Sequence, residues 1–213
     1  MRLVVLISGS GSNLQAILDA ARSGRLDAQV ELVVSNRKDA YGLVRAAQAA
    51  VPTLYFPLGP YTAANRSRDE YDADLAQLVA GQRPDLVVLA GFMRILTDNF
   101  VLRYQGRMLN IHPSLLPAFP GLDTHARALA AGVKLHGCTV HYVTADLDHG
   151  PIVIQASVPV LPHDDEAQLA ARVLVQEHRI YPQAARWFLD GTLAIEGGVV
   201  RVSGGQAQQL YAP

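Results

Sequence analysis

The chain has 213 residues, very little cysteine and no long apolar run. Cys138 is its only cysteine, which excludes an intrachain disulfide and a cysteine zinc cluster. No apolar run reaches the roughly 18 residues of a membrane-spanning helix. The short apolar run after Arg2 leads into a glycine turn instead of a cleavage site, so it indicates a strand and not a signal peptide. We therefore expect a cytoplasmic protein with no membrane partner.

The sequence also has no excess of charge of either sign. Its formal net charge is −1, its pI is about 6.6, and its basic residues are scattered, which argues against a nucleic-acid partner. What the chain does have is apolar residues, at 50% of the total, with only 17% charged. That composition suits a sizeable core, and the length suits one α/β unit.

The first half alternates apolar runs with segments of helical spacing. Strands are predicted at 3–7, 30–34, 53–56, 86–90 and 108–112. Helices are predicted at 14–24, 40–50, 67–79 and 97–104. A capping box formed by Ser67 and Glu70 marks the start of the third helix. Strands that alternate with helices predict a parallel sheet with right-handed crossovers.

The second half has a different order of elements. A short helix at 124–131 is followed by strands at 138–143 and 152–160, which are joined without a helix and so should be antiparallel. A long helix should run from Asp164 or Asp165 towards Leu189, kinked or interrupted at Pro182, and a hairpin should span 193–202. We expect a single-domain α/β fold over 1–213. It should have a mostly parallel, twisted sheet of about seven strands, a Rossmann-like N-terminal half, helices on both faces and antiparallel C-terminal strands.

The segment from Leu109 to His125, LNIHPSLLPAFPGLDTH, ends a predicted strand and enters a proline-rich loop. Asn110 and His112 lie two residues apart and so share one face of the strand, which should end at Pro113. An amide can donate to a developing oxyanion, and an imidazole can transfer a proton near neutral pH. The alternative is that Asn110 caps a turn and His112 is a core histidine.

The first loop, from Gly9 to Asn13, is a candidate anion site because successive N–H groups at the start of a helix can hold a phosphate. Leu14 replaces the third glycine of the dinucleotide fingerprint, and no Gly-Lys-Ser/Thr follows as in a P-loop. The loop therefore suits a single phosphate on a small ligand. The alternative is an ordinary tight turn.

Asp148, which precedes His149 and Gly150, is a candidate partner for His112. A carboxylate near an imidazole raises its basicity and orients it. An Asx turn before Gly150 is the alternative.

Two other polar side chains leave alternatives open. Arg94 either holds an anionic or heteroaromatic ligand or pairs with a carboxylate, and Glu177 either binds a substrate amine or is a solvated helix charge. His136, His141 and His149 with Asp148 are a candidate metal site, but His141 should lie on the opposite strand face from His136 and Cys138, which argues against it.

Together the motifs resemble the family of folate-dependent glycinamide ribonucleotide (phosphoribosylglycinamide) formyltransferases. They are VVLISGSGSNLQAI, LAGFMRIL, LNIHPSLLPAFPG, HGCTVHYVTADLDHGPI and QEHRIYP. The resemblance covers nearly the whole chain. It implies formyl transfer from 10-formyltetrahydrofolate to the amine of N1-(5-phospho-D-ribosyl)glycinamide in purine (IMP) biosynthesis.

The resemblance also implies roles for residues of this sequence. Asn110, His112 and Asp148 match the family's catalytic residues, and Gly11, Ser12, Asn13 and Glu177 match substrate-binding positions. Folate contacts are implied for Arg68, Met93, Arg94, Ile95, Leu96, Asn110, Thr144, Ala145, Asp146, Leu147 and Asp148. Phosphate binding is then expected within residues 1–105, and catalysis and folate binding within 106–213. A monomer or homodimer is expected, without a metal.

The sequence departs from the family pattern at Ser10, Ala118, Asp123, His149 and Leu174, which bears on affinity and pH dependence.

Formyltetrahydrofolate deformylase, in which water replaces the amine, is the nearest alternative. It carries an added N-terminal regulatory domain, whereas the first strand here is expected to begin at residue 2. Methionyl-tRNA formyltransferase has a C-terminal RNA-binding domain that this chain lacks the length and basic charge to form. A non-enzymatic folate- or nucleotide-binding module is the alternative of a different class.

Overall fold

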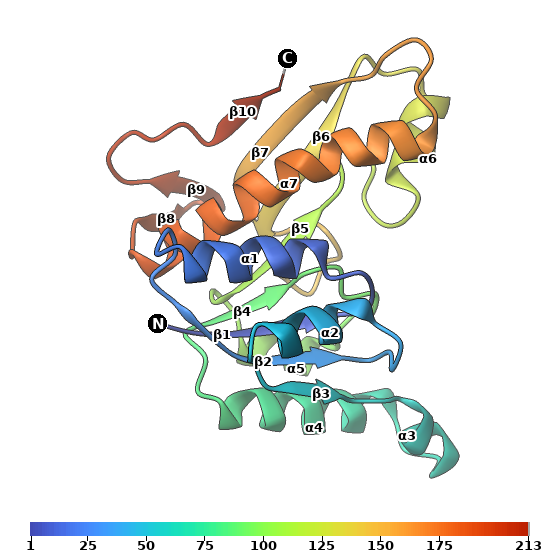
Figure 1. Cartoon of the computed structure of the whole chain (residues 1–213), viewed down its shortest axis with the longest axis vertical. Coiled ribbons are helices and arrows are strands. Elements are labelled where there is room, and N and C mark those ends of the chain that lie inside the picture. Colours follow the sequence, from blue (N-terminus) through green and yellow to red (C-terminus); the bar gives the residue numbers. More distant parts are fainter. Residues whose placement is uncertain (213) are drawn as a thin grey trace. The chain divides into compact units, whose positions relative to one another are not determined.

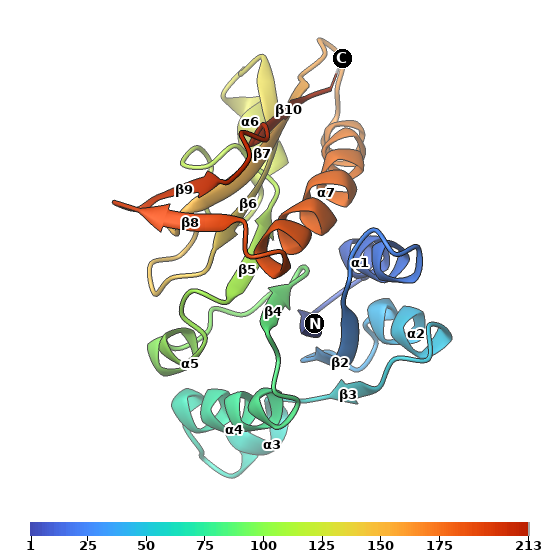
Figure 2. The same ribbon diagram turned by 90° about the vertical axis from the view of Figure 1, so that its left-hand side faces the viewer.

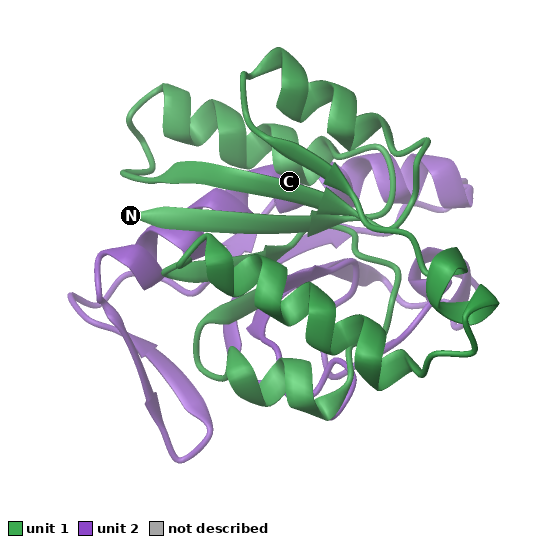
Figure 3. Cartoon of the chain, turned by 90° about the horizontal axis from the view of Figure 1, so that it is seen from below, with its two compact units in different colours: residues 1–109 green, residues 110–213 purple. Residues whose placement is uncertain are grey.

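The computed structural model describes residues 1–212. It divides into two compact units, residues 1–109 and 110–213, shown in two colours in Figure 3. The division falls inside strand β5 (Met108–His112), so one strand contributes to both units. Within the described part of the chain, none of the helices has the length and apolarity needed to cross a bilayer.

Unit 1 is built on parallel strands in the order β4-β1-β2-β3. Its strands are β1 (Arg2–Ile7), β2 (Gln29–Ser35), β3 (Thr53–Tyr55) and β4 (Leu86–Leu89). Its helices are α1 (Ser12–Arg22), α2 (Tyr41–Gln48), α3 (Gly59–Ala63), α4 (Arg68–Gly81) and α5 (Asp98–Arg103). Figure 2 shows α1 and α2 on one face of these strands and α4 and α5 on the other. The side chains of Leu3 to Ile7 are fully buried, as expected for a central strand covered on both faces.

Unit 2 combines the end of β5 with an antiparallel pair, β6 (Leu135–Tyr142) and β7 (Ile152–Pro159), and with β10 (Gln209–Tyr211), which pairs parallel to β7. Its helices are α6 (Thr124–Ala130) and α7 (Glu166–Leu189). The predicted hairpin is confirmed as β8 (Leu193–Glu196) and β9 (Val199–Val202). The antiparallel pairing predicted for the segments around 138–143 and 152–160 is also confirmed.

Taken through β5, the strands form one mostly parallel, eight-stranded sheet in the order β10-β7-β6-β5-β4-β1-β2-β3. This confirms the predicted α/β class with about seven strands, and the strand not foreseen is β10. Both β10 and the unforeseen helix α3 are too short to show a periodic pattern, with three and five residues.

Helix α7, the long orange helix lying along β6 and β7 in Figure 1, runs from Glu166 to Leu189 without interruption. The predicted interruption at Pro182 is therefore wrong, whereas a kink there stays a prediction. A proline inside a helix costs about 3 kcal/mol. Here Tyr181, Pro182 and Ala184 all lie on the buried face, and burial of that face offsets the cost. The helix begins at the predicted cap, where Asp165 and Gln168 form a capping box.

Candidate active site

The loop after β1 is shaped by a close approach of two glycines within unit 1. Gly11 has a φ of +69°, and a Cβ built on it would lie 2.4 Å from the Cα of Gly42. The Gly42 N–H donates to the Gly9 carbonyl at 3.1 Å, which ties the start of α2 to the loop. Helix α1 begins at Ser12, so its first N–H groups lie at the loop and suit an anion.

Two side chains that sequence analysis missed fasten this loop. The Ser8 hydroxyl donates to Asn36 Oδ1 at 2.6 Å and accepts from the Met93 N–H at 2.8 Å. The Arg45 Nε–H donates to the Ser10 carbonyl at 2.9 Å. These partners lie far from the loop in the sequence, so no local pattern identifies them. They hold the loop in place and join it to the segment that follows β4.

Arg94 pairs with a carboxylate, which is one of the two alternatives left open by the sequence. Its guanidinium lies 3.4 Å from Asp72 Oδ1 and stacks over the ring of Tyr71, 4.3 Å from the ring centroid. Asp72 is fully buried and also accepts the Thr97 N–H at 2.8 Å. Asp72 therefore fixes both the side chain of Arg94 and the backbone after it.

The rest of the segment after β4 exposes apolar side chains. Met93 and Ile95 are 60% and 57% exposed, whereas Leu96 is buried. The Arg68 guanidinium donates to the Ile95 carbonyl. The segment is thus held by its backbone while two large apolar side chains face solvent, which suits contact with an apolar ligand.

In unit 2 the structure brings together the predicted catalytic side chains. Asn110 and His112 lie on β5, and His112 Nδ1 is 3.4 Å from Asp148 Oδ2. Asp148 adopts a φ of +56° and accepts the Gly121 N–H at 2.8 Å. The carboxylate is therefore aimed at His112 by the loop that carries Gly121, which a lone Asx turn would not require.

Both ring nitrogens of His112 face groups that only accept hydrogen bonds. Nε2 lies 3.0 Å from the Phe119 carbonyl, and Nδ1 faces the Asp148 carboxylate. A hydrogen on either ring nitrogen would therefore meet an acceptor. The His112 side chain is 6% exposed and that of Asp148 is 8% exposed, so this contact is shielded from solvent.

A second imidazole, His141, also contacts this group and was not predicted as functional. His141 Nε2 lies 3.1 Å from Asn110 Nδ2 and 3.8 Å from Asp148 Oδ1. Its Nδ1 lies 2.9 Å from the Tyr142 carbonyl. Burial lowers the pKa of His141, although the Tyr142 carbonyl and Asp148 act in the opposite direction. Sequence analysis considered His141 only as a metal ligand.

Two more histidines pair nearby in the same unit. His125 Nδ1 lies 3.2 Å from His136 Nε2. Burial lowers the pKa of His136 to about 4 and also lowers that of His125. No group of three or more His, Cys, Asp or Glu residues suited to a metal ion is found among residues 1–212.

Glu177 lies on α7 and is only 7% exposed. The alternative of a solvated helix charge is therefore wrong.

The predicted folate loop at 144–148 is largely exposed, with Leu147 at 49%. Its Thr144 hydroxyl donates to the Asp146 carbonyl at 3.2 Å, which tightens the turn.

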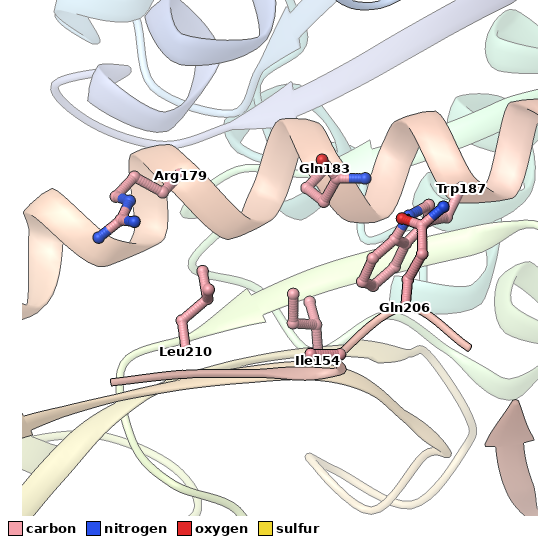
Figure 4. A pocket seen from close by; sticks show the side chains of 7 residues that line it. Ile154, Arg179, Gln183, Trp187, Gln206 and Leu210 are labelled. Carbon is pink, nitrogen blue, oxygen red and sulfur yellow. The ribbon is translucent and has the colours of Figure 1, made fainter. Parts of the chain in front are cut away.

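A cavity of about 310 Å³ lies in unit 2 between α7, β7 and the C-terminal segment (Figure 4). It is lined by Ile154, Arg179, Gln183, Trp187, Gln206, Ala207 and Leu210. The Trp187 indole donates to Gln206 Oε1 at 2.6 Å and so closes one end of it. None of the predicted functional residues lines this cavity.

Comparison with known proteins shows the family to which the chain belongs. A family model described as formyl transferase matches residues 1–185. The chain therefore belongs to the formyl transferase family. It is a formyltransferase, an enzyme that transfers a one-carbon group.

Two similar proteins are named as formyltransferases that act on one particular substrate. Phosphoribosylglycinamide formyltransferase of Escherichia coli (strain K12) is 50% identical over 204 residues, which cover 96% of this chain and 94% of that protein. The crystal structure of glycinamide ribonucleotide transformylase 1 from Symbiobacterium toebii matches with a TM-score of 0.91 at 52% identity, covering 95% of this chain and 93% of that one. A formyltetrahydrofolate deformylase from Pseudomonas syringae pv. tomato is more distant, with a TM-score of 0.86 at 29% identity. That match covers 94% of this chain and 65% of the deformylase.

Proposed function

We propose that the protein transfers the formyl group of 10-formyltetrahydrofolate to the primary amine of N1-(5-phospho-D-ribosyl)glycinamide, in de novo purine (IMP) biosynthesis. The observation that carries this proposal is the grouping of Asn110, His112 and Asp148, with 3.4 Å between His112 Nδ1 and Asp148 Oδ2. The high identity to a phosphoribosylglycinamide formyltransferase supports the choice of substrate.

In the proposed reaction the amine attacks the formyl carbon, a new C–N bond forms and the carbonyl electrons move onto oxygen. The Asn110 amide and the protonated His112 ring stabilise that oxyanion. Collapse of the tetrahedral intermediate breaks the bond between the formyl carbon and N10 of the folate. The proton released by the amine reaches N10 through water with the help of Asp148, which also orients the His112 ring.

Substrate binding is proposed to use both backbone and side chains. The phosphate would accept from N–H groups of Gly11, Ser12 and Asn13, and Glu177 would hold the glycinamide part. The formyl folate would contact Arg68, the segment from Met93 to Leu96, Asn110 and the loop 144–148. Because the Arg94 guanidinium already pairs with Asp72, Arg94 would contribute through its main chain.

The main alternative acceptor is water, which would make the protein a deformylase. The anion loop after β1 argues against this, because a hydrolase acting on formyl folate has no ribonucleotide phosphate to hold there. The lower identity to the deformylase points the same way. A binding module without catalysis would have no need for the ion pair of His112 with Asp148.

The decisive experiment follows tetrahydrofolate production from 10-formyltetrahydrofolate with and without the ribonucleotide. Product that depends on the ribonucleotide is expected, and product without it would instead establish the deformylase. His112→Ala should abolish turnover, whereas His163→Ala, at an exposed histidine, should not. Full turnover by His112→Ala would contradict the catalytic assignment.

Three further expectations belong to this proposal. The protein is expected to be cytoplasmic, to be a monomer or homodimer and to need no metal ion. Activity that persists after dialysis against EDTA would agree with the last of these, and activity restored only by a divalent cation would contradict it.

A further inference from the structure

His141 is buried beside the proposed catalytic groups, yet the mechanism above gives it no task. It is 2% exposed and lies near the end of β6, and both of its ring nitrogens are within hydrogen-bond distance of a partner. One partner is the Tyr142 carbonyl and the other is the Asn110 amide. Since the two partners differ in chemistry, they fix where the ring carries its proton.

The Tyr142 carbonyl can only accept, so His141 Nδ1, 2.9 Å away, must carry a hydrogen. In the neutral ring the other nitrogen, Nε2, is then an acceptor. It faces Asn110 Nδ2, a donor, at 3.1 Å. The arrangement is self-consistent only with the amide nitrogen of Asn110, and not its oxygen, turned towards His141.

We propose that His141 is a positioning residue for formyl transfer, whose unprotonated Nε2 fixes the orientation of the Asn110 amide so that its second N–H is presented to the developing oxyanion. This rests on the proposed function, because the oxyanion belongs to that reaction. An Asn side chain with no such partner can turn by 180° and present its oxygen, which repels an oxyanion instead of stabilising it.

The charged groups that face His141 come from two other segments. Asp148 Oδ1, on the loop after β6, lies 3.8 Å from Nε2, and His112 lies on β5. Asp148 favours protonation of His141 and His112 opposes it. A proton on Nε2 would place two donors, Nε2–H and Nδ2–H, against each other and would force the Asn110 amide to turn. The two imidazoles thus lie on either side of one carboxylate, with His112 Nδ1 near Asp148 Oδ2 and His141 Nε2 near Asp148 Oδ1.

The test is a double-mutant cycle between His141 and Asn110, read as kcat with saturating substrates. Asn110→Ala should lower kcat by about 100-fold or more, as for loss of one oxyanion donor. His141→Phe keeps the ring shape but removes the acceptor, and should lower kcat by about 10- to 100-fold with little change in KM. Combined with Asn110→Ala, it should cost less than about threefold more, because its effect passes through Asn110.

Two variants separate positioning from packing. His141→Gln can still offer a carbonyl oxygen to the amide and should recover part of the kcat lost in His141→Phe. Val140→Ala, at a fully buried position on the same strand, should lower the melting temperature but leave kcat within about threefold. A His141→Phe enzyme with unchanged kcat, or with a loss that multiplies with that of Asn110→Ala, would overturn the proposal.

A spectroscopic measurement needs no substrate and remains decisive if a variant fails to fold. Long-range ¹H–¹⁵N correlation spectra of the wild-type protein should show His141 with a protonated Nδ1 and an unprotonated Nε2. The opposite tautomer, or a charged ring at pH 7.5, would overturn the proposal. Absence of formyl transfer by the wild type would instead overturn the proposed function while leaving this tautomer result standing.

Discussion

The two units differ in the kind of chemistry their residues offer. All seven histidines of the chain, from His112 to His178, fall in unit 2, and unit 1 has none. The candidate site of unit 1 is a glycine loop at the start of a helix, where main-chain N–H groups are proposed to bind the phosphate. The candidate site of unit 2 consists of titratable side chains: His112, Asp148 and His141.

This difference predicts how each site can fail. Main-chain donors do not titrate, and among the amino acids only proline lacks the N–H, so unit 1 should be sensitive mainly to proline and to changes that move the backbone. A site made of side chains can lose its function when one atom of a side chain is replaced, and its function responds to pH.

Asp148→Asn should lower kcat by about 100-fold or more, because a neutral amide neither stabilises the charged His112 ring nor moves a proton. Folate binding should largely persist. The change is backbone-neutral, since Asn tolerates the positive φ of Asp148. Steady-state kinetics and equilibrium binding of a folate analogue would measure the two effects separately.

The matched control is Asp123→Asn, since Asp123 also has a positive φ, of +55°, but is exposed. It should leave kcat within about twofold. If Asp148→Asn lost folate binding as strongly as turnover, Asp148 would be a structural residue and the contrast between the units would weaken.

As the pH falls, unit 2 should lose stability before unit 1 does. An unfolded His136 takes up a proton at its ordinary pKa of 6.5, whereas burial lowers the folded value to about 4. The unfolded state therefore binds more protons between these values, and the free energy of unfolding falls as the pH falls through this window. The full loss from His136 alone is about 3 kcal/mol, and the lowered pKa values of His125 and His141 act in the same direction.

Hydrogen exchange at pH 7.5 and pH 5 would measure this effect strand by strand. Protection factors should fall more for amides of β6 than for amides of β1, and His136→Phe should reduce the difference. His163→Gln, at an exposed position, should behave as the wild type. Equal losses in β1 and β6 would show that the two units respond to acid as one.

Gly11→Ala should damage unit 1 through its backbone. The added Cβ would meet Gly42 Cα at 2.4 Å, and the residue would be held at a φ of +69°. We expect a loss of about 2 kcal/mol of stability and a rise of about tenfold in the KM for the ribonucleotide. Gly24→Ala has a similar φ, of +73°, but open space around it, so it should lose stability without changing that KM.

Ser10→Asn should have the smallest effect, although it changes a side chain of the anion loop. Ser10 is exposed, and its carbonyl is held by Arg45. Because main-chain N–H groups are proposed to hold the phosphate, the KM for the ribonucleotide should change by less than about threefold. A larger change would mean that side chains share in phosphate binding.

Sequence patterns were sufficient to predict the helices and strands that bury long apolar runs. The strands around Leu3 to Ile7 and Leu86 to Leu89 and the hairpin near the C-terminus follow from local composition and turn residues. The capping box at Ser67 is also local. The alternative of an interruption at Pro182 was wrong because the burial of helix α7 against β6 and β7 is a tertiary effect.

The candidate site was predictable only in part. Asn110, His112 and Asp148 could be proposed because their motifs resemble those of a known family. Ser8, Arg45 and His141 could not, because each acts through a partner distant in sequence, such as Met93 for Ser8. The burial of Glu177 could not be predicted either, because the spacing of apolar residues on a helix does not show which elements cover each of its faces.

The contact between Gly11 and Gly42 has a consequence for laboratory evolution of this chain. A Cβ on Gly42 would in turn lie 2.4 Å from Ile7 Cδ1 and 3.1 Å from Gly11 Cα. Randomising either glycine alone should therefore return mostly the parental residue. Randomising both together should not help either, since two side chains would then compete for a gap that holds none. Libraries aimed at new phosphorylated acceptors should leave this pair untouched and diversify the exposed positions around it.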